Sequence, residues 1–265
     1  MLEIKGVYKT FNAGTINEKK ALQDLNLVLN DGDFVTVIGG NGAGKSTMLN
    51  SIAGVFPVDF GHIYIGGTDV TGMKEHMRAK FLGRVFQDPM MGTAADMWIE
   101  ENMALAGRRG QSRGLRWAIT NKEREEFREL LKELDLGLEN RLSTKVGLLS
   151  GGQRQALTLL MATMKKPQLL LLDEHTAALD PKTAAKVLDL TDKLIREDGL
   201  TALMITHNMR DAIHYGNRLI MMNEGRIILD VSGEEKKRLT VEDLLAAFSR
   251  LSGNEFANDR ALLVN

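Results

Sequence analysis

The chain has 265 residues, of which 43% are hydrophobic and 26% are charged, and its formal net charge is -1. This composition is that of a folded globular protein rather than a disordered chain, and the near-neutral charge gives no support to a nucleic-acid-binding surface. Because the sequence contains no cysteine, disulfides, thiolate zinc sites and cysteine nucleophiles are excluded.

The first fifty residues predict short strands followed by a helix. Residues 2–8 and 25–29 alternate apolar and polar side chains, which is the pattern of half-buried strands. Asn30–Asp33 contains an Asp-Gly pair, and this pair predicts a tight hairpin turn. Residues 34–38 form a continuous apolar run that leads into glycines, as a buried strand would, and residues 45–53 predict a helix.

The middle of the chain is predicted to be helical, and strands return after it. Residues from about Asp96 to Asn140 combine apolar positions at helical spacing with charged residues between them. Residues 169–172 then form a short apolar strand. Asp180-Pro181 opens a further helix as N-cap and first-turn proline, and residues 201–206 predict another strand. The pattern indicates an α/β core that is interrupted by a helical insertion.

The last third of the chain predicts a hairpin and a short helical tail. Residues 218–223 and 226–231 flank a Glu-Gly turn, and we expect them to pair as two antiparallel strands. Thr240 and Asp243 have the spacing of a capping box at the start of a helix.

A glycine-rich segment lies between the apolar run and the helix near the N-terminus. Gly39–Ser46 satisfies the pattern G-x-x-x-x-G-K-[ST] in the strand–helix context that this phosphate-binding loop requires. Its glycines let backbone N–H groups turn inward around phosphate oxygens, and the following helix adds its N-terminal dipole. The alternative is a glycine-rich turn that binds nothing, and the loop alone does not separate an ATPase from a GTPase, kinase or helicase. The predicted nucleotide-binding residues are Gly39, Asn41, Gly42, Ala43, Gly44, Lys45, Ser46 and Thr47.

We assign separate roles to the polar side chains of this loop. Lys45 is expected to bridge the β- and γ-phosphates, Ser46 to bind Mg²⁺ and Thr47 to contact the α-phosphate. A second acidic element completes the prediction, because the apolar strand at 169–172 ends in Asp173 and Glu174. Asp173 is expected to approach Mg²⁺, and Glu174 to accept a proton from the attacking water.

The segment Leu149–Gln153, Leu-Ser-Gly-Gly-Gln, narrows the class of protein. Its serine and glycines at the start of a predicted helix make a second anion site in the same chain. This pentapeptide, about twenty residues before the Asp-Glu pair, resembles the signature of ABC ATPases. The resemblance extends from Leu2 to about Val231. It implies that Ser150, Gly151, Gly152 and Gln153 contact a nucleotide held by a second subunit.

Further residues match the motifs of the same family in the same order. Gln87 matches the glutamine loop, and the resemblance implies that it contacts Mg²⁺ and takes part in catalysis with Lys45. Ala178–Asp180 matches the D-loop, so Asp180 is expected at the nucleotide and subunit contact. His207 matches the switch histidine, a catalytic residue. Phe11 lies where the family stacks an aromatic side chain on adenine, and Tyr8 is the alternative.

The resemblance implies an α/β fold, that of a P-loop NTPase of the ABC ATPase type. This fold has a RecA-like core, an antiparallel β subdomain and a helical subdomain. We expect the ATPase domain at residues 1–232, with the helical subdomain inserted at about residues 88–165. Residues 233–265 would then form the short C-terminal helical tail. His175, which follows the acidic pair, is assigned a structural role.

Three functions are compatible with this resemblance, and transport is favoured. The chain would bind ATP and Mg²⁺, pair with a second copy of itself, and drive solute import through a separate integral membrane permease. A solute-binding protein would be an indirect partner, and amino acids are a candidate cargo. The first alternative is a soluble ABC ATPase that acts on ribosomes or DNA, and the second is a regulator that rarely hydrolyses ATP. No apolar stretch approaches the ~18 residues of a membrane span. The expected location is therefore cytoplasmic, and the permease would hold the chain at the inner face of the membrane.

Two surface features each have two alternative interpretations. Met90 and Met91 follow the glutamine loop, and they either contact the permease or pack inside the helical insertion. A basic cluster lies nearby in the sequence and is either solvated surface or a contact for lipid headgroups. Its members are Arg108, Arg109, Arg113 and Arg116.

Overall fold

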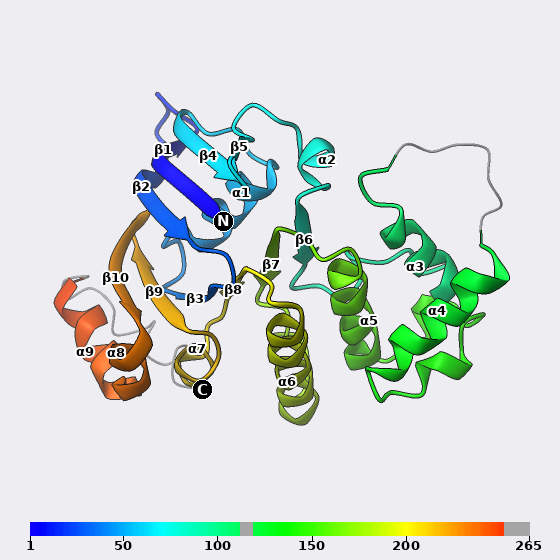
Figure 1. Ribbon diagram of the computed structural model, residues 1–265. Helices are drawn as coiled ribbons and strands as arrows, with labels where there is room; N and C mark the ends of the chain where they lie inside the picture. The colour runs from blue at the N-terminus through cyan, green and yellow to red at the C-terminus, as the bar shows by residue number, and fades with distance from the viewer. Residues whose placement is uncertain (112–118, 252–265) are drawn as a thin grey trace.

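The computed structural model describes residues 1–111 and 119–251, which form two β-sheets with helices around them (Figure 1). The smaller sheet has four strands in the order β2-β1-β4-β5, and all of its pairs are antiparallel. The larger sheet has six strands in the order β10-β9-β3-β8-β7-β6. The strands of the smaller sheet are β1 (Leu2–Phe11), β2 (Lys19–Leu29), β4 (Phe60–Ile65) and β5 (Thr68–Asp69). Those of the larger sheet are β3 (Phe34–Ile38), β6 (Leu82–Val85), β7 (Leu169–Asp173), β8 (Ala202–Ile205), β9 (Arg218–Asn223) and β10 (Arg226–Ser232).

The helices of the described residues occupy the connections between these strands. The first group is α1 (Lys45–Ala53), α2 (Glu75–Arg78), α3 (Ile99–Gly107), α4 (Asn121–Lys132) and α5 (Gly151–Thr163). The second is α6 (Pro181–Asp198), α7 (Met209–His214), α8 (Gly233–Arg238) and α9 (Val241–Leu251), and two 3₁₀ turns lie at Leu138–Asn140 and Val146–Leu148. None of the helices in the described part of the chain is both long and apolar enough to cross a membrane.

The predicted hairpin at Asn30–Asp33 is wrong, because the two strands that it joins lie in different sheets. The turn itself forms: the Asp33 amide donates to the Asn30 carbonyl at 3.1 Å. β3 is buried at all five positions, and such a strand needs both faces of its sheet covered. It therefore pairs in parallel with β8 and β9, while the half-exposed β2 pairs with β1.

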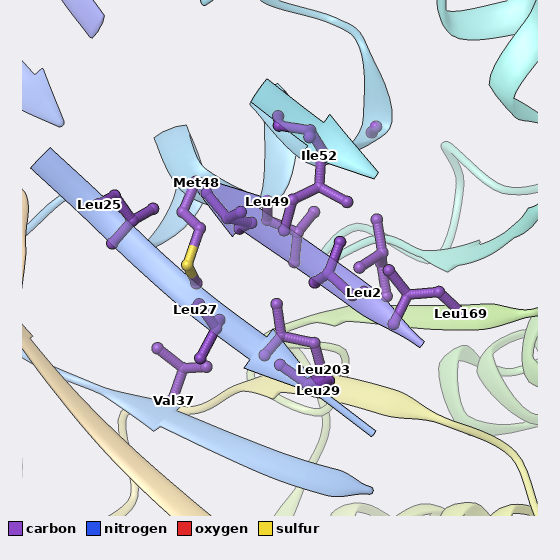
Figure 2. Close-up of a cluster of buried hydrophobic side chains, with 14 of the residues drawn as sticks. Leu2, Leu25, Leu27, Leu29, Val37, Met48, Leu49, Ile52, Leu169 and Leu203 are labelled. Carbon is purple, nitrogen blue, oxygen red and sulfur yellow. The ribbon is translucent and has the colours of Figure 1, made fainter. Parts of the chain in front are cut away.

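A hydrophobic core between the two sheets holds α1 in place (Figure 2). Leu2 and the alternating leucines of β2 face this core from the smaller sheet, as the period of two in a strand requires. The larger sheet and α1 supply the rest of the cluster. The labelled members are Leu2, Leu25, Leu27, Leu29, Val37, Met48, Leu49, Ile52, Leu169 and Leu203. Because α1 is packed on both sides, the loop before it has a fixed base.

The parallel strands β3, β8, β7 and β6 end at one common edge of the larger sheet. The register pairs Val37 with Ile205, and Ile205 with Asp173. It also pairs Val85 with Leu172 on the next strand. Segments far apart in the sequence therefore start at the same edge, which is where open α/β sheets bind ligands.

Helices α3 and α4 lie in the part of the chain, from about Asp96 to Asn140, where the sequence pattern predicts helices. α3, α4 and α5 share a second apolar core, at one side of the sheet (Figure 1). Thr120 caps α4, and the Glu123 side chain accepts from the Thr120 amide at 2.7 Å, which forms a capping box.

The C-terminal hairpin and helix are also confirmed. β9 and β10 pair in antiparallel fashion, and Thr240 accepts from the Asp243 amide at 3.2 Å at the start of α9. Leu244 and Phe248 of α9 are buried with side chains of α7 and β9. Lys236 of α8 donates to the carbonyls of Tyr215 and Gly216, and burial lowers the pKa of Lys236 to about 8. The described residues after Val231 therefore pack against the larger sheet.

Candidate functional site

The loop between β3 and α1 requires glycine at two positions. Gly39 has a φ of +151°, and a Cβ atom there would lie 2.3 Å from the carbonyl oxygen of Met222. Gly44 has a φ of +100°, and its Cβ atom would lie 2.6 Å from the carbonyl oxygen of Ala21. The loop therefore presses its backbone against β9 on one side and β2 on the other, with no space for a side chain. This is the shape of a backbone cradle for phosphate groups.

Lys45 is the first residue of α1, and its ammonium group turns back over the loop. The side chain is 5% exposed, and Nζ donates to the carbonyl oxygens of Gly39 at 2.6 Å and Gly40 at 3.1 Å. The loop opens into a cavity of about 230 Å³. The cavity is lined by Lys19, Ala21, Asn41, Gly42, Ala43, Gly44, Lys45, Ser46, Thr47, Glu174 and His207. The structure thus brings most of the predicted loop residues together with two predicted catalytic residues.

Glu174 and His207 form a close pair at this cavity. Oε1 of Glu174 lies 2.6 Å from Nε2 of His207. Glu174 has a φ of +46°, a conformation that costs energy for a residue other than glycine and that often occurs at functional sites. Its amide donates to the carbonyl of Ile205 at 3.1 Å. Glu174 lines the phosphate cavity, whereas its neighbour Asp173 does not.

Asp173 lies at the end of β7 and lines a different cavity. This second cavity, of about 690 Å³, is also lined by Gln87, Arg84 and Met91. Burial raises the pKa of Asp173, and the positive charge of Arg84, whose Nη2 lies 3.9 Å from Oδ2, opposes that shift. The expected metal-binding residues are therefore divided: Ser46 lines the phosphate cavity, while Gln87 and Asp173 line the second one.

The donor groups fit a magnesium ion that a nucleotide brings with it. Within the described ranges, no group of three or more His, Cys, Asp or Glu side chains could hold a metal by itself. Ser46 supplies one hydroxyl oxygen, and Asp173 supplies one carboxylate. Mg²⁺ binds to so few protein ligands when substrate phosphates and water molecules complete its coordination shell.

The signature segment lies at the start of α5 and lines neither cavity. Ser150 is the N-cap, and the amide of Gln153 donates to its hydroxyl at 3.2 Å. The Gln153 side chain in turn accepts from the Ser150 amide at 3.2 Å, so both side chains serve the helix start. A Cβ atom on Gly152 would lie 2.2 Å from Thr183 of α6. Gly152 is therefore packed against α6, while Gly151 lies near Leu179 in the turn before that helix. The structure does not bring this segment to the phosphate loop of the same chain.

Asp180 and His175 flank the turn between β7 and α6. Asp180 caps α6, accepting from the Thr183 amide at 3.1 Å. His175 is buried, its Nε2 lies 3.0 Å from the hydroxyl of Thr191, and burial lowers its pKa to about 4. A histidine that stays neutral inside the core supports the structural role assigned to it.

Phe11 ends β1 beside a residue that sequence reasoning missed. Phe11 is in register with Lys19 of β2, and Lys19 lines the phosphate cavity. The Phe11 ring meets that of Phe56 edge-on, with centroids 5.2 Å apart. The alternative platform, Tyr8, is instead in register with Phe60. No local motif identifies Lys19, because it lies near the loop only in the folded protein, where the β2 backbone at Ala21 packs against Gly44.

We expect Phe11→Ala to raise the Michaelis constant for ATP roughly tenfold, since stacking of a base on an aromatic ring contributes about 1–3 kcal/mol. Steady-state ATPase assays over a range of ATP concentrations measure this, with Tyr8→Ala as the matched aromatic control. An increase for Tyr8→Ala and not for Phe11→Ala would move the adenine platform to Tyr8.

Met90 and Met91 are 45% and 68% exposed, so the alternative that both pack inside the helical insertion is wrong. The basic cluster is not a free cationic patch within the described residues. Arg108 pairs with Glu123 at 3.2 Å, and Arg109 donates to the carbonyl of Ala162 at 3.0 Å. Arg113 and Arg116 lie outside the described residues.

A glycine loop that cradles phosphates, with a lysine, a carboxylate pair and a histidine at the ends of parallel strands, defines a P-loop nucleotide hydrolase. The family model described as ABC transporter matches residues 22–177. The chain belongs to the ABC transporter family, and it is an ATP-binding protein that hydrolyses ATP.

Named relatives cover almost the whole chain. The chain is 44% identical over 248 residues to the tyrosine transport ATP-binding protein of Clostridioides difficile (strain R20291), covering 94% of this chain and 98% of the relative. It is 34% identical over 265 residues to the ABC transporter ATP-binding protein YxdL of Bacillus subtilis (strain 168), covering 98% and 96%. These names are those of transporter ATPases, in agreement with the favoured class.

Solved structures agree with the fold. A dimeric ATP-binding cassette in a post-hydrolysis state, bound to ADP and Pi, has a TM-score of 0.74 at 31% identity and covers 88% of this chain and 98% of its own. The ADP conformation of another ATP-binding cassette of an ABC transporter has a TM-score of 0.76 at 28% identity, covering 94% and 98%. The predicted fold class, an ABC-type P-loop ATPase, is confirmed.

Proposed function

We propose that this ABC transporter ATPase drives the import of an amino acid, with aromatic amino acids the favoured class. The observation that carries the proposal is the 44% identity, over 94% of this chain, to a relative named for tyrosine transport. Relatives named as import ATPases, for spermidine/putrescine and for phosphonates, support the direction at 32% identity. ATPase subunits of this kind work through a membrane partner, so the substrate is inferred from the relative and not from any residue of this chain.

In the proposed reaction, the residues of the phosphate cavity divide the work. Lys45 binds the β- and γ-phosphates, and the loop amides surround them. Ser46 and Asp173 would hold Mg²⁺, which would neutralise part of the phosphate charge when bound with ATP. Glu174 accepts the proton of the attacking water, and His207, 2.6 Å from it, holds its carboxylate in place.

Two chains are proposed to pair head to tail around two ATP molecules. Ser150 and the amides of Gly151 and Gly152 lie at the N-terminus of α5, where the helix dipole favours an anion. Because this segment lines neither cavity of its own chain, a γ-phosphate held by a second copy is the ligand that it fits. The dimeric cassette among the solved structures supports the pairing of two copies.

The proposed contact with the permease lies around the second cavity. Gln87, Asp88 and Met91 line it, and the exposed thioether side chains of Met90 and Met91 suit an adaptable apolar contact. Gln87 belongs to the same wall as Asp173, so occupation of the nucleotide site and docking of the permease would be coupled through this loop. The chain would then sit on the inner face of the membrane, with a solute-binding protein as an indirect partner.

The test is uptake of radiolabelled amino acids by the host cell. We expect deletion of the gene for this chain to lower tyrosine uptake at least tenfold, because a transporter without ATP hydrolysis cannot concentrate its solute. The wild-type gene should restore uptake, whereas a gene encoding Glu174→Gln should not. Unchanged uptake of tyrosine, phenylalanine and tryptophan in the deletion strain would contradict the substrate class, and a uniform screen of other amino acids would then identify the cargo.

A further inference from the structure

A partly buried arginine, Arg84, lies between Asp173 and a second carboxylate, Glu75. Arg84 is the third residue of β6, and its side chain is 14% exposed. It is in register with Leu171 of β7, which places it diagonally across from Asp173, two residues further along that strand. Diagonal neighbours on one face of a sheet lie within reach of a long side chain. The guanidinium group therefore meets Asp173 on the face of the sheet that α1 covers.

Two contacts hold the guanidinium group in place. Nη2 donates to Oδ1 of Asn50, on α1, at 2.6 Å. Cζ lies 4.5 Å from the centroid of the Phe86 ring, a cation–π contact that a planar guanidinium favours. Phe86 directly precedes Gln87, so the arginine packs against the start of the glutamine loop.

The two carboxylates are both at the outer limit of an ion pair. Nη2 is 3.9 Å from Oδ2 of Asp173, and Nη1 is 4.0 Å from Oε1 of Glu75. The guanidinium group makes a close bidentate contact with neither of them, although such contacts are its strongest mode of binding. Its Nε is buried and has no hydrogen-bond partner. A buried donor without an acceptor is costly, so the guanidinium group lacks a complete set of acceptors in this position.

The positive charge of Arg84 affects any cation that binds to Asp173. Asp173 is 17% exposed, so its charge is only partly screened by water. A divalent cation that enters here shares Asp173 with the guanidinium group and is repelled by it. Glu75, on the short helix α2 and 58% exposed, is the second carboxylate to which the guanidinium group can turn.

We propose that Arg84 is a positioning residue for Asp173, with Glu75 as its alternate partner. Before the metal binds, Arg84 balances the charge of Asp173. When Mg²⁺ arrives with the nucleotide, the guanidinium group turns toward Glu75 and leaves Asp173 to the metal. Because the group also contacts Asn50 of α1 and Phe86 before the glutamine loop, the exchange links metal binding to the wall of the second cavity. This inference rests on the proposed role of Asp173.

The test is the affinity of the protein–ADP complex for Mn²⁺, measured from the free-ion electron paramagnetic resonance signal. Removing a neighbouring positive charge in Arg84→Gln should tighten Mn²⁺ binding roughly fivefold, and Glu75→Gln should weaken it roughly threefold, because Arg84 then has only Asp173 as a carboxylate. The double variant should bind Mn²⁺ with the same affinity as Arg84→Gln, because Glu75 acts through Arg84. Shifts of the same sign in the two single variants, or no shift in either, would overturn the proposal.

The controls separate this proposal from the one on which it rests. Glu242→Gln, which removes an exposed carboxylate from α9, corrects for the change in net charge. Asp173→Asn should weaken Mn²⁺ binding, and a wild-type affinity in that variant would remove Asp173 from the metal and the role of Arg84 with it. If Asp173→Asn weakens Mn²⁺ binding but the Arg84 and Glu75 variants do not shift the affinity in opposite directions, the proposed role of Arg84 is wrong and that of Asp173 stands. Glu75→Gln, at an exposed position, keeps the test decisive if Arg84→Gln does not fold.

Discussion

Glu174→Gln is expected to bind ATP but to hydrolyse it ~10²–10⁴-fold more slowly than the wild type, which is the usual contribution of a general base. The amide has the shape of the carboxylate but cannot accept a proton from water. The backbone at this position is also strained, because Glu174 has a φ of +46°. Its Oε1 atom lies 2.6 Å from Nε2 of His207. With hydrolysis blocked, the γ-phosphate contacts persist, and the proposed head-to-tail dimer should accumulate.

Two measurements check this expectation. Phosphate release reports turnover, and size-exclusion chromatography with ATP and Mg²⁺ reports the dimer. Glu197→Gln is a matched control, because Glu197 is an exposed carboxylate near the C-terminal end of α6, the helix whose other end follows the catalytic pair. Turnover in Glu174→Gln within twofold of the wild type would remove Glu174 from the role of base.

The parts of the site that depend on neighbours in the sequence could be predicted, and the parts that depend on strand pairing could not. Lys45 and Ser46 follow from a local glycine pattern, and Asp173 and Glu174 from an apolar strand that ends in acids. Lys19 lines the same cavity, and it does so because β2 packs against the loop, with the Ala21 carbonyl beside Gly44. A lysine in a half-exposed strand carries no local signal of such a contact.

The contacts of Arg84 and the strand pairing around the turn at Asn30–Asp33 also could not be predicted from neighbouring residues in the sequence. The contacts of Arg84 come from β7, α1 and α2. The sequence of residues 82–87 does not indicate that these three elements meet at Arg84. The Asp-Gly pair predicts the turn, but it does not reveal whether the strand after the turn pairs with the strand before it. The continuous burial of β3 decides that point, because such a strand belongs in the interior of a covered sheet.

Gly39→Ala is expected to lower the free energy of unfolding by about 3 kcal/mol and to abolish nucleotide binding, because overpacking and backbone strain each cost about 1–3 kcal/mol. The added Cβ atom would lie 2.3 Å from the carbonyl oxygen of Met222 and 3.2 Å from Cβ of Ala43. Ile38, the residue before it, is held in register with Met221 of β9. Since the strand cannot shift without breaking this pairing, the loop itself must move, and the carbonyl groups that Lys45 contacts would move with it.

Urea unfolding followed by circular dichroism measures the stability of this variant, and a fluorescent ATP analogue measures binding. Gly72→Ala is the matched control: a Cβ atom at Gly72 meets nothing within 4 Å, and its φ is outside the positive region, so stability should stay within about 0.5 kcal/mol of the wild type. If Gly39→Ala were as stable as Gly72→Ala and bound the analogue normally, the backbone of the phosphate loop would not be pressed against β9. If it were destabilised but still bound ATP with wild-type affinity, the loop could tolerate the displacement, and the placement of phosphates between Gly39 and Lys45 would be wrong.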